Sequence, residues 1–134
     1  MQFIAFAKAR PGQLNYASAG NGSGAHLFSE MFRMMTGVNI VHIPYKGAAP
    51  ALIDVVAGQA QVMFTSPLAA LPQVKAGRLR ALGMAGAKRS PAAPDIPTVA
   101  EQGVPGYEAN LWYGVTGPAG LPKSIVTTLH AETV

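Results

Sequence analysis

A glycine-rich turn near the start of the chain contains the residues best suited to chemistry. Gly20, Gly22 and Gly24 alternate with Asn21 and Ser23. Glycine has no Cβ atom, so the backbone of such a turn can adopt positive φ and its N–H groups can approach a bound atom closely. Asn21 and Ser23 add side-chain hydrogen-bond donors. The spacing predicts a loop that holds a small ligand through hydrogen bonds.

The residues after this turn predict a helix that starts at the loop. Apolar residues recur at helical spacing from Leu27 to Met35, on one face of an expected helix over residues 23–35. The first N–H groups of a helix have no intrahelical partner and carry the positive end of the helix dipole. His26 lies in this first turn, where it would either contact a ligand or cap the helix. A glycine-rich loop at this position predicts an anion site.

Two other interpretations of the turn stay open. Gly20 to Ala25 satisfies the loose dinucleotide-binding pattern, which also requires an acidic residue about 20 positions later at the end of the second strand. Residues 42–46, HIPYK, occupy that place and contain no carboxylate. No Gly-Lys-Ser or Gly-Lys-Thr follows the turn, so it is not a Walker loop. The turn can also be purely structural, but an anion site is the favoured interpretation.

Strands alternate with helices along the first half of the chain. Residues 14–18, 38–43 and 61–64 are predicted strands, and a helical pattern follows each of them. Residues 38–43 are β-branched and apolar at most positions, as in a strand buried on both faces. This alternation predicts an α/β fold with a mainly parallel sheet and helices on both faces.

The turns after these three strands are expected to meet. The carboxyl ends of parallel strands lie at one edge of a sheet, where such folds bind ligands. Lys46 is the cation nearest to that edge in the sequence. The neutral hydrogen-bonding residues expected there are Ser18, Asn21, Ser23, Tyr45, Thr65 and Ser66. Together these groups predict a surface that binds a small carboxylate or a similar anion.

The remaining elements are predicted from local patterns. Residues 2–9 form a helix, and residues 79–84 a fourth strand. Thr98 and Glu101 fit a capping box, which predicts a short helix. Residues 107–115 are a predicted strand, and residues from Lys123 onwards a helix.

Composition excludes several classes of function. With 134 residues, 49% of them apolar, the chain is expected to form one compact domain. No apolar run approaches the roughly 18 residues that span a bilayer. The net charge is +4, but the cations are scattered and predict a solvated surface and no nucleic-acid partner. The absence of cysteine excludes disulfides, and the histidines and carboxylates show no spacing for a metal, a cofactor or an acid–base pair. Asp54 is expected to be a solvated helix residue, and His42 to be hydrogen-bonded in or beside the sheet.

Residues 11–27, PGQLNYASAGNGSGAHL, closely resemble the solute receptors of the tripartite tricarboxylate transporters, called Bug receptors. The resemblance continues through five further segments and covers essentially the whole chain. These segments are residues 41–51, 58–64, 75–82, 97–106 and 112–114. The resemblance implies a two-lobed periplasmic binding protein of the second type. Such a receptor captures a small carboxylated solute, which can be a di- or tricarboxylate, an amino acid or an aromatic acid, and delivers it to the membrane subunits of the transporter.

The resemblance also implies how the chain is divided. Residues 1–12 would be the end of a helix leading in from the other lobe, residues 13–108 the second ligand-binding lobe, and residues 109–134 a crossing strand with the start of a returning helix. Its ligand loops correspond here to Ser18, Asn21, Gly22, Ser23, Gly24, Tyr45, Lys46, Gly47, Ala48, Thr65 and Ser66. Many relatives have Asp-Asn where this chain has Thr65-Ser66, so a negative charge is absent from the cleft.

Two expectations follow from this resemblance. Because a first lobe and an export leader are not seen, the chain is expected to be a fragment of a receptor or a degraded one. It is expected to associate with itself through apolar residues of its terminal helices. These residues are Phe3, Phe6, Ile125, Val126 and Leu129. The alternative functions are the effector-binding domain of a regulator and a nucleotide-binding α/β enzyme domain.

Overall fold

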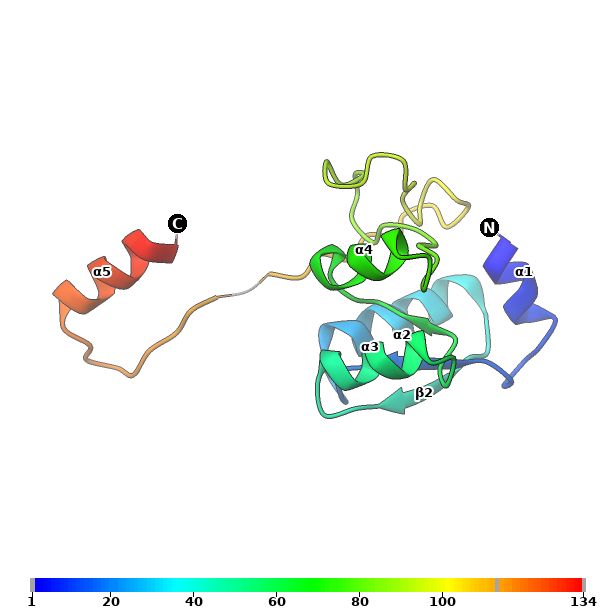
Figure 1. Ribbon diagram of the computed structural model, residues 1–134, viewed down its shortest axis with the longest axis horizontal. Helices are drawn as coiled ribbons and strands as arrows, with labels where there is room; N and C mark the ends of the chain where they lie inside the picture. The colour runs from blue at the N-terminus through cyan, green and yellow to red at the C-terminus, as the bar shows by residue number, and fades with distance from the viewer. Residues whose placement is uncertain (1, 113, 134) are drawn as a thin grey trace.

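The computed structural model describes residues 2–112 and 114–133, and within them three strands form one parallel sheet (Figure 1). The strands are β1 (Asn15–Ser18), β2 (Val41–Pro44) and β3 (Val62–Met63), in the order β2-β1-β3. Tyr16 of β1 pairs with His42 on one side and with Val62 on the other. The predicted parallel sheet is confirmed.

Five helices accompany these strands in the described part of the chain. They are α1 (Gln2–Lys8), α2 (Gly24–Thr36), α3 (Ala48–Val56), α4 (Pro67–Lys75) and α5 (Lys123–Thr133). Gly37 ends α2 in the left-handed conformation, with φ 68°, and donates its N–H to the carbonyl of Arg33 at 2.8 Å. Glycine tolerates this conformation because it has no Cβ atom.

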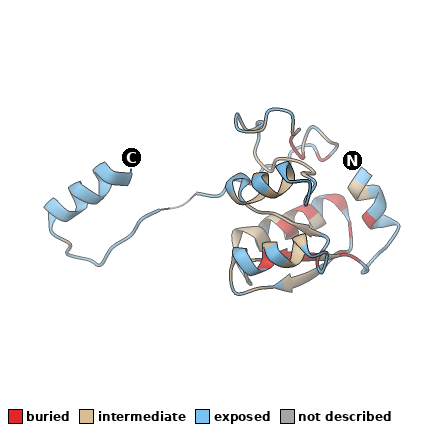
Figure 2. Ribbon diagram, in the orientation of Figure 1, coloured by how far each residue is buried: buried red, intermediate tan, exposed pale blue. Residues whose placement is uncertain are grey.

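The helices cover both faces of the sheet, because neighbouring residues of β1 point to opposite sides. Tyr16 is fully buried in the larger core, which contains Phe32 of α2. Ala17 is fully buried in a smaller core with Ala51 of α3. Figure 2 shows the buried residues gathered around β1 and the helices beside it. The prediction of helices on both faces is confirmed.

The second strand differs from its prediction. Val38 and Ile40 are buried, but both precede β2. Val41, within β2, is 43% exposed. The prediction of a strand buried on both faces is wrong, because no residue of β2 is buried: Val41 and Pro44 are exposed, and His42 and Ile43 are half-buried.

The predicted fourth strand over residues 79–84 is also wrong. Met84 makes a single parallel bridge to Thr98 and joins no sheet. Its N–H donates to the carbonyl of Pro97 at 2.9 Å, and its carbonyl accepts from Val99 at 2.8 Å. The backbone hydrogen bonds of Met84 are therefore made with a neighbouring loop. No strand pairing joins this segment to β3.

The capping box forms without the predicted helix. The N–H of Thr98 donates to the carboxylate of Glu101 at 2.7 Å, and the N–H of Glu101 donates to the hydroxyl of Thr98 at 3.0 Å. Gly103 and Gly106 then adopt positive φ values of 102° and 80°, which a right-handed helix does not contain. Residues 98–106 consequently form a series of turns.

The end of the chain leaves the body of the molecule as an arm. Residues 107–112 and 114–115 form no strand, so the prediction of a strand over residues 107–115 is wrong for the described residues, and Tyr113 lies outside them. The helix predicted from Lys123 is confirmed as α5, which lies apart from the sheet in Figure 1 and contains no buried residue. None of the described helices has the length and apolar character needed to cross a bilayer.

Candidate functional site

The glycine-rich turn after β1 is held in place by hydrogen bonds on both sides. The N–H of Gly20 donates to Ser18 Oγ at 3.1 Å, and the N–H of Ser23 donates to the carbonyl of Gly20 at 3.2 Å. Gly20 has a φ of 131°, and a Cβ atom there would lie 3.1 Å from the carbonyl oxygen of Tyr45. This position therefore needs glycine for both its conformation and its close approach to the next loop.

The turn leads directly into the N-terminus of α2. Ser23 is the N-cap, and its hydroxyl accepts the N–H of His26 at 3.3 Å. The N–H groups of Gly24 and Ala25 donate to no residue of the described chain. Both residues line a cavity. Two backbone donors without a partner therefore belong to cavity-lining residues at a helix N-terminus, which fits the anion-site hypothesis.

The loop after β2 lies against this turn. The N–H of Tyr45 donates to the carbonyl of Ser18 at 3.0 Å, so the first and second loops are joined. The hydroxyl of Tyr45 donates to Asp54 Oδ2 at 2.7 Å, and this bond raises the pKa of Tyr45. Asp54 lies in a helix as expected, and its residue is half-buried with the carboxylate against the Tyr45 hydroxyl. Lys46 is exposed, and Gly47 is the N-cap of α3.

The loop after β3 has the same design as the first. Ser66 is the N-cap of α4, and its hydroxyl accepts the N–H of Ala69 at 3.4 Å. Pro67 occupies the first helical position, where its missing N–H costs nothing. Thr65 is half-buried and Ser66 is exposed. The structure thus places a third helix N-terminus after the third parallel strand.

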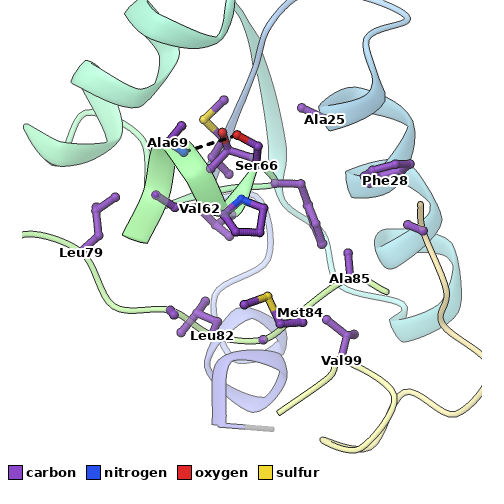
Figure 3. A pocket seen from close by; sticks show the side chains of 18 of the residues that line it. Ala25, Phe28, Val62, Ser66, Ala69, Leu79, Leu82, Met84, Ala85 and Val99 are labelled. Atoms are coloured by element: carbon purple, nitrogen blue, oxygen red, sulfur yellow. Dashed lines mark hydrogen bonds between the residues drawn. The ribbon is translucent and has the colours of Figure 1, made fainter. Parts of the chain in front are cut away.

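The three loops contribute to one cavity of about 1110 Å³, seen from close by in Figure 3. Five of the predicted site residues line it. These are Ser23, Gly24, Ala48, Thr65 and Ser66. Seven predicted residues do not line it and lie in or behind the loops. These are Ser18, Asn21, Gly22, His26, Tyr45, Lys46 and Gly47.

Ser18 and His26 belong to a packed network beneath the first loop. Ser18 is fully buried, and its Oγ lies 2.6 Å from His42 Nε2, which confirms the expectation of a hydrogen-bonded His42. The His42 ring stacks against the rings of both His26 and Tyr16, with centroid distances of 4.2 and 4.7 Å. His26 Nδ1 accepts the N–H of Gly22 at 3.0 Å. The network positions the loop, and burial makes the Ser18 hydroxyl inaccessible to a substrate.

Glu30 completes the network on the helix side. Its carboxylate accepts the hydroxyl of Tyr16 at 2.5 Å and the guanidinium of Arg33 at 2.7 Å. The Tyr16 hydrogen bond, with Arg33 as a further contributor, lowers the pKa of Glu30. Burial, with the proximity of His26, lowers the pKa of His42. At neutral pH this network consequently contains an ionised Glu30 and a neutral His42.

Ala25 and Leu111 are among the cavity residues that were not predicted from the sequence. Ala25 offers a free N–H, which follows from its position two residues after the N-cap. Leu111 packs against Gly24, where a Cβ atom would lie 2.7 Å from Leu111 Cδ1. The contact joins residues far apart in the sequence, so no local pattern could have revealed it. Within the described residues, no group of three or more histidine, aspartate or glutamate side chains is placed to hold a metal ion.

Comparison with solved structures places this arrangement among solute receptors. An R. palustris protein in complex with adipate superposes with a TM-score of 0.92 and 43% identity, over 96% of this chain and 43% of that one. Rhodopseudomonas palustris MatC with bound malate gives a TM-score of 0.88 and 32% identity, over 97% of this chain and 44% of MatC. The periplasmic binding protein BugD superposes with a TM-score of 0.88 and 34% identity, over 96% of this chain and 43% of BugD.

Sequence comparison agrees with the structural one. A protein encoded in the tcbD-tcbE intergenic region of Pseudomonas sp. strain P51 is 41% identical over 98% of this chain and 39% of its own length. The chain thus spans less than half the length of these relatives. The family model described as the tripartite tricarboxylate transporter family receptor matches residues 1–134. The chain therefore belongs to the tripartite tricarboxylate transporter receptor family, whose members are periplasmic solute-binding proteins.

Proposed function

We propose that residues 13–108 form one ligand-binding lobe of a periplasmic receptor and take up a small carboxylate at the edge formed by the three loops. The observation that carries this proposal is the pair of unused N–H donors of Gly24 and Ala25, which line the cavity at the N-terminus of α2. A carboxylate oxygen is the ligand that such donors bind best. The adipate and malate complexes of two similar proteins support the same class of solute.

The charges around the loops favour a solute without an ammonium group. The carboxylates closest to the loops belong to Glu30 and Asp54, and both already accept hydrogen bonds from tyrosine hydroxyls. An amino acid would bring an ammonium group that needs an acidic acceptor. Lys46, exposed beside the second loop, instead adds positive charge. We therefore favour a di- or tricarboxylate or an aromatic acid over an amino acid.

The remaining segments would connect this lobe to its surroundings. In a full-length receptor, residues 1–12 and 109–134 would lead to the other lobe, and the closed receptor would deliver its solute to the membrane subunits of a tripartite transporter. The arm is consistent with this role, because residues 110–112 and 114–120 are exposed and make no strand. Its exposed Ile125, Val126 and Leu129 also support self-association of the isolated chain. Phe3 is only half-buried against Phe32, so it contributes less to such a surface than expected.

An NMR titration of the chain with adipate tests the binding site. One lobe supplies only part of the donors of a closed receptor, so we expect a dissociation constant in the millimolar range. The amide signals of Gly24, Ala25 and Ser66 should move with the added ligand. Aspartate, at the same pH and ionic strength, should move them less. Adipate that shifts only residues remote from the three loops would contradict the proposal.

Variants of Ser66 and Ser124 provide a comparison. Ser66 is the exposed N-cap of α4 at the cavity, and Ser124 is exposed on α5 and does not line this cavity. Ser66→Ala should weaken adipate binding, and Ser124→Ala should leave it unchanged. Equal effects of the two changes would show that any loss arises from general destabilisation and not from the site.

A further inference from the structure

His26 occupies a position at the start of α2 that usually holds a different residue type. Ser23 is the N-cap, so His26 is the third helical residue. In a capping box this position is normally glutamate or glutamine, whose side-chain oxygen reaches back to a free N–H at the start of the helix. Here His26 Nδ1 accepts the N–H of Gly22 at 3.0 Å, and the hydroxyl of Ser23 accepts the N–H of His26 at 3.3 Å. An imidazole thus takes the place of the carboxylate or amide that holds such a turn.

An imidazole nitrogen accepts a hydrogen bond only while it carries no proton. Nδ1 of His26 is therefore the unprotonated nitrogen, and the ring hydrogen lies on Nε2. In a protonated ring both nitrogens are donors, so the N–H of Gly22 would point at another N–H. Rotation of the ring about its Cβ–Cγ bond brings a carbon atom to that place, which is no acceptor either. Histidine side chains ordinarily change charge between about pH 5 and 8, whereas a capping glutamine keeps its acceptor throughout.

The neighbouring His42 does not have this property. Its Nε2 lies 2.6 Å from Ser18 Oγ, and a hydroxyl oxygen can accept a hydrogen bond as well as donate one. Ser18 Oγ also lies 3.1 Å from the carbonyl of Gly20, so its hydrogen can turn to that carbonyl when His42 donates. The bond between β1 and β2 therefore survives protonation of His42, whereas the bond between the first loop and His26 does not survive protonation of His26.

Four titratable or charged residues lie around His26. The rings of Tyr16 and His42 lie on the side of the sheet, with centroid distances of 6.4 and 4.2 Å, and burial lowers the pKa of His42. On α2, the carboxylate of Glu30 has the charge opposite to that of a protonated His26, and Arg33 offsets it through a bond of 2.7 Å. The two charges oppose each other, so the main consequence of a proton on His26 is the loss of its bond to Gly22.

We propose, on the basis of the carboxylate site proposed above, that His26 is a positioning residue for that site and makes its affinity depend on pH. The neutral ring holds Gly22 and thereby orients the loop that precedes the unpartnered donors of Gly24 and Ala25. The protonated ring releases Gly22, the first loop loses one of its anchors, and solute binding weakens in acid. His26 does not line the cavity, so its charge reaches a bound carboxylate only across the loop, where water and salt screen it.

Two substitutions of equal shape test the role of the acceptor. Asparagine and leucine branch at the same carbon, but only asparagine has an oxygen where His26 has Nδ1, and neither side chain titrates. Both substitutions remove the stacking with His42, so the difference between them reports the acceptor alone. We expect His26→Asn to bind adipate about fivefold more tightly than His26→Leu, which corresponds to about one hydrogen bond.

The unchanged chain should lose affinity relative to His26→Asn as pH falls. Between about pH 8 and about pH 5.5, the ratio of its dissociation constant for adipate to that of His26→Asn should rise about fivefold. Protonation of adipate itself affects both proteins and cancels in this ratio. A constant ratio would overturn the proposal. A ratio that falls in acid would overturn it as well, because the charge of His26 would then act directly on the solute.

The amide signal of Gly22 provides a readout without ligand. In the unchanged chain this NMR signal should move with the same midpoint as the ring nitrogens of His26. In His26→Asn, which keeps His42, it should stay in place. A Gly22 signal that does not follow His26 would overturn the proposal even if adipate binds. Absence of adipate binding at about pH 8, with a Gly22 signal that still follows His26, would contradict the carboxylate site and support the release of the loop by His26.

Discussion

The exchange of one glycine for alanine separates the binding role of the first loop from its structural role. Gly22 has a φ of 76° and Gly37 a φ of 68°, and at both positions a Cβ atom would meet nothing within 4 Å. Gly22→Ala and Gly37→Ala therefore introduce the same left-handed alanine without a steric clash. The left-handed conformation costs alanine about 1–2 kcal/mol. Part of this cost is offset because alanine lowers the conformational entropy of the unfolded chain. Each variant should lose about 1 kcal/mol of stability, or roughly 4 °C in Tm.

Only Gly22→Ala should also change binding. The N–H of Gly22 donates to His26 Nδ1 at 3.0 Å, and this bond orients the loop that precedes the free donors of Gly24 and Ala25. A strained residue 22 relaxes towards negative φ and breaks the bond. The loss of one hydrogen bond is worth about 1 kcal/mol, so the dissociation constant for adipate should rise about fivefold. Gly37 ends α2 far along the helix from the loop and serves as the control.

Thermal unfolding followed by circular dichroism and an adipate titration followed by NMR measure the two quantities on the same samples. A fivefold weaker binding in Gly22→Ala, with equal losses of Tm in both variants, supports the argument. Two results would refute it. Unchanged binding in Gly22→Ala would show that the loop conformation does not control the donors, and equal weakening in Gly37→Ala would show that stability alone controls binding.

Three further predictions concern the surroundings of the site. Lys46→Ala should weaken adipate binding by about 1 kcal/mol in low salt, and the difference from the unchanged chain should shrink in titrations at high salt. Stability should fall with acid: the lowered pKa of Glu30 stabilises the fold above its ordinary value of 4.5, and this contribution disappears as pH falls through the lowered pKa. The lowered pKa of His42 also makes the fold less stable as pH falls below 6.5. Urea unfolding at pH 7, 5 and 4 should therefore show a progressive loss of the free energy of unfolding, and this loss should be smaller in Glu30→Gln. Tyr107→Phe should cost about 1 kcal/mol in urea unfolding, because it removes the hydroxyl that donates to the carbonyl of Phe28 at 3.0 Å; a stability equal to that of the unchanged chain would show that this bond contributes nothing.

The sequence by itself determined the first half of the fold. Local signals specify its elements: Ser23 and Ser66 cap helices, and Gly37 ends one. The apolar spacing from Leu27 to Met35 predicted the helix but not its buried face, because Leu27, Met34 and Met35 are exposed. The buried residues of α2 are Ser29, Phe32 and Thr36. Each signal acts within a few residues, so the order of strands and helices and the loops at the carboxyl edge could be predicted. The long ordered set of family motifs identified the receptor family for the same reason, since motifs are properties of the sequence.

Only the tertiary structure decided the second half and the details of the site. Residues 79–84 have the composition of a strand, but a strand forms only where a neighbour supplies its hydrogen bonds, and β3 does not pair with them. The bond between Ser18 and His42, and the contact of Leu111 with Gly24, join positions that no local pattern relates. Ser18 was expected among the ligand-binding residues, yet the packing of β2 against β1 buries it beneath the loop. Helices and turns are specified by neighbours in the sequence, whereas sheet pairing and burial depend on neighbours in space.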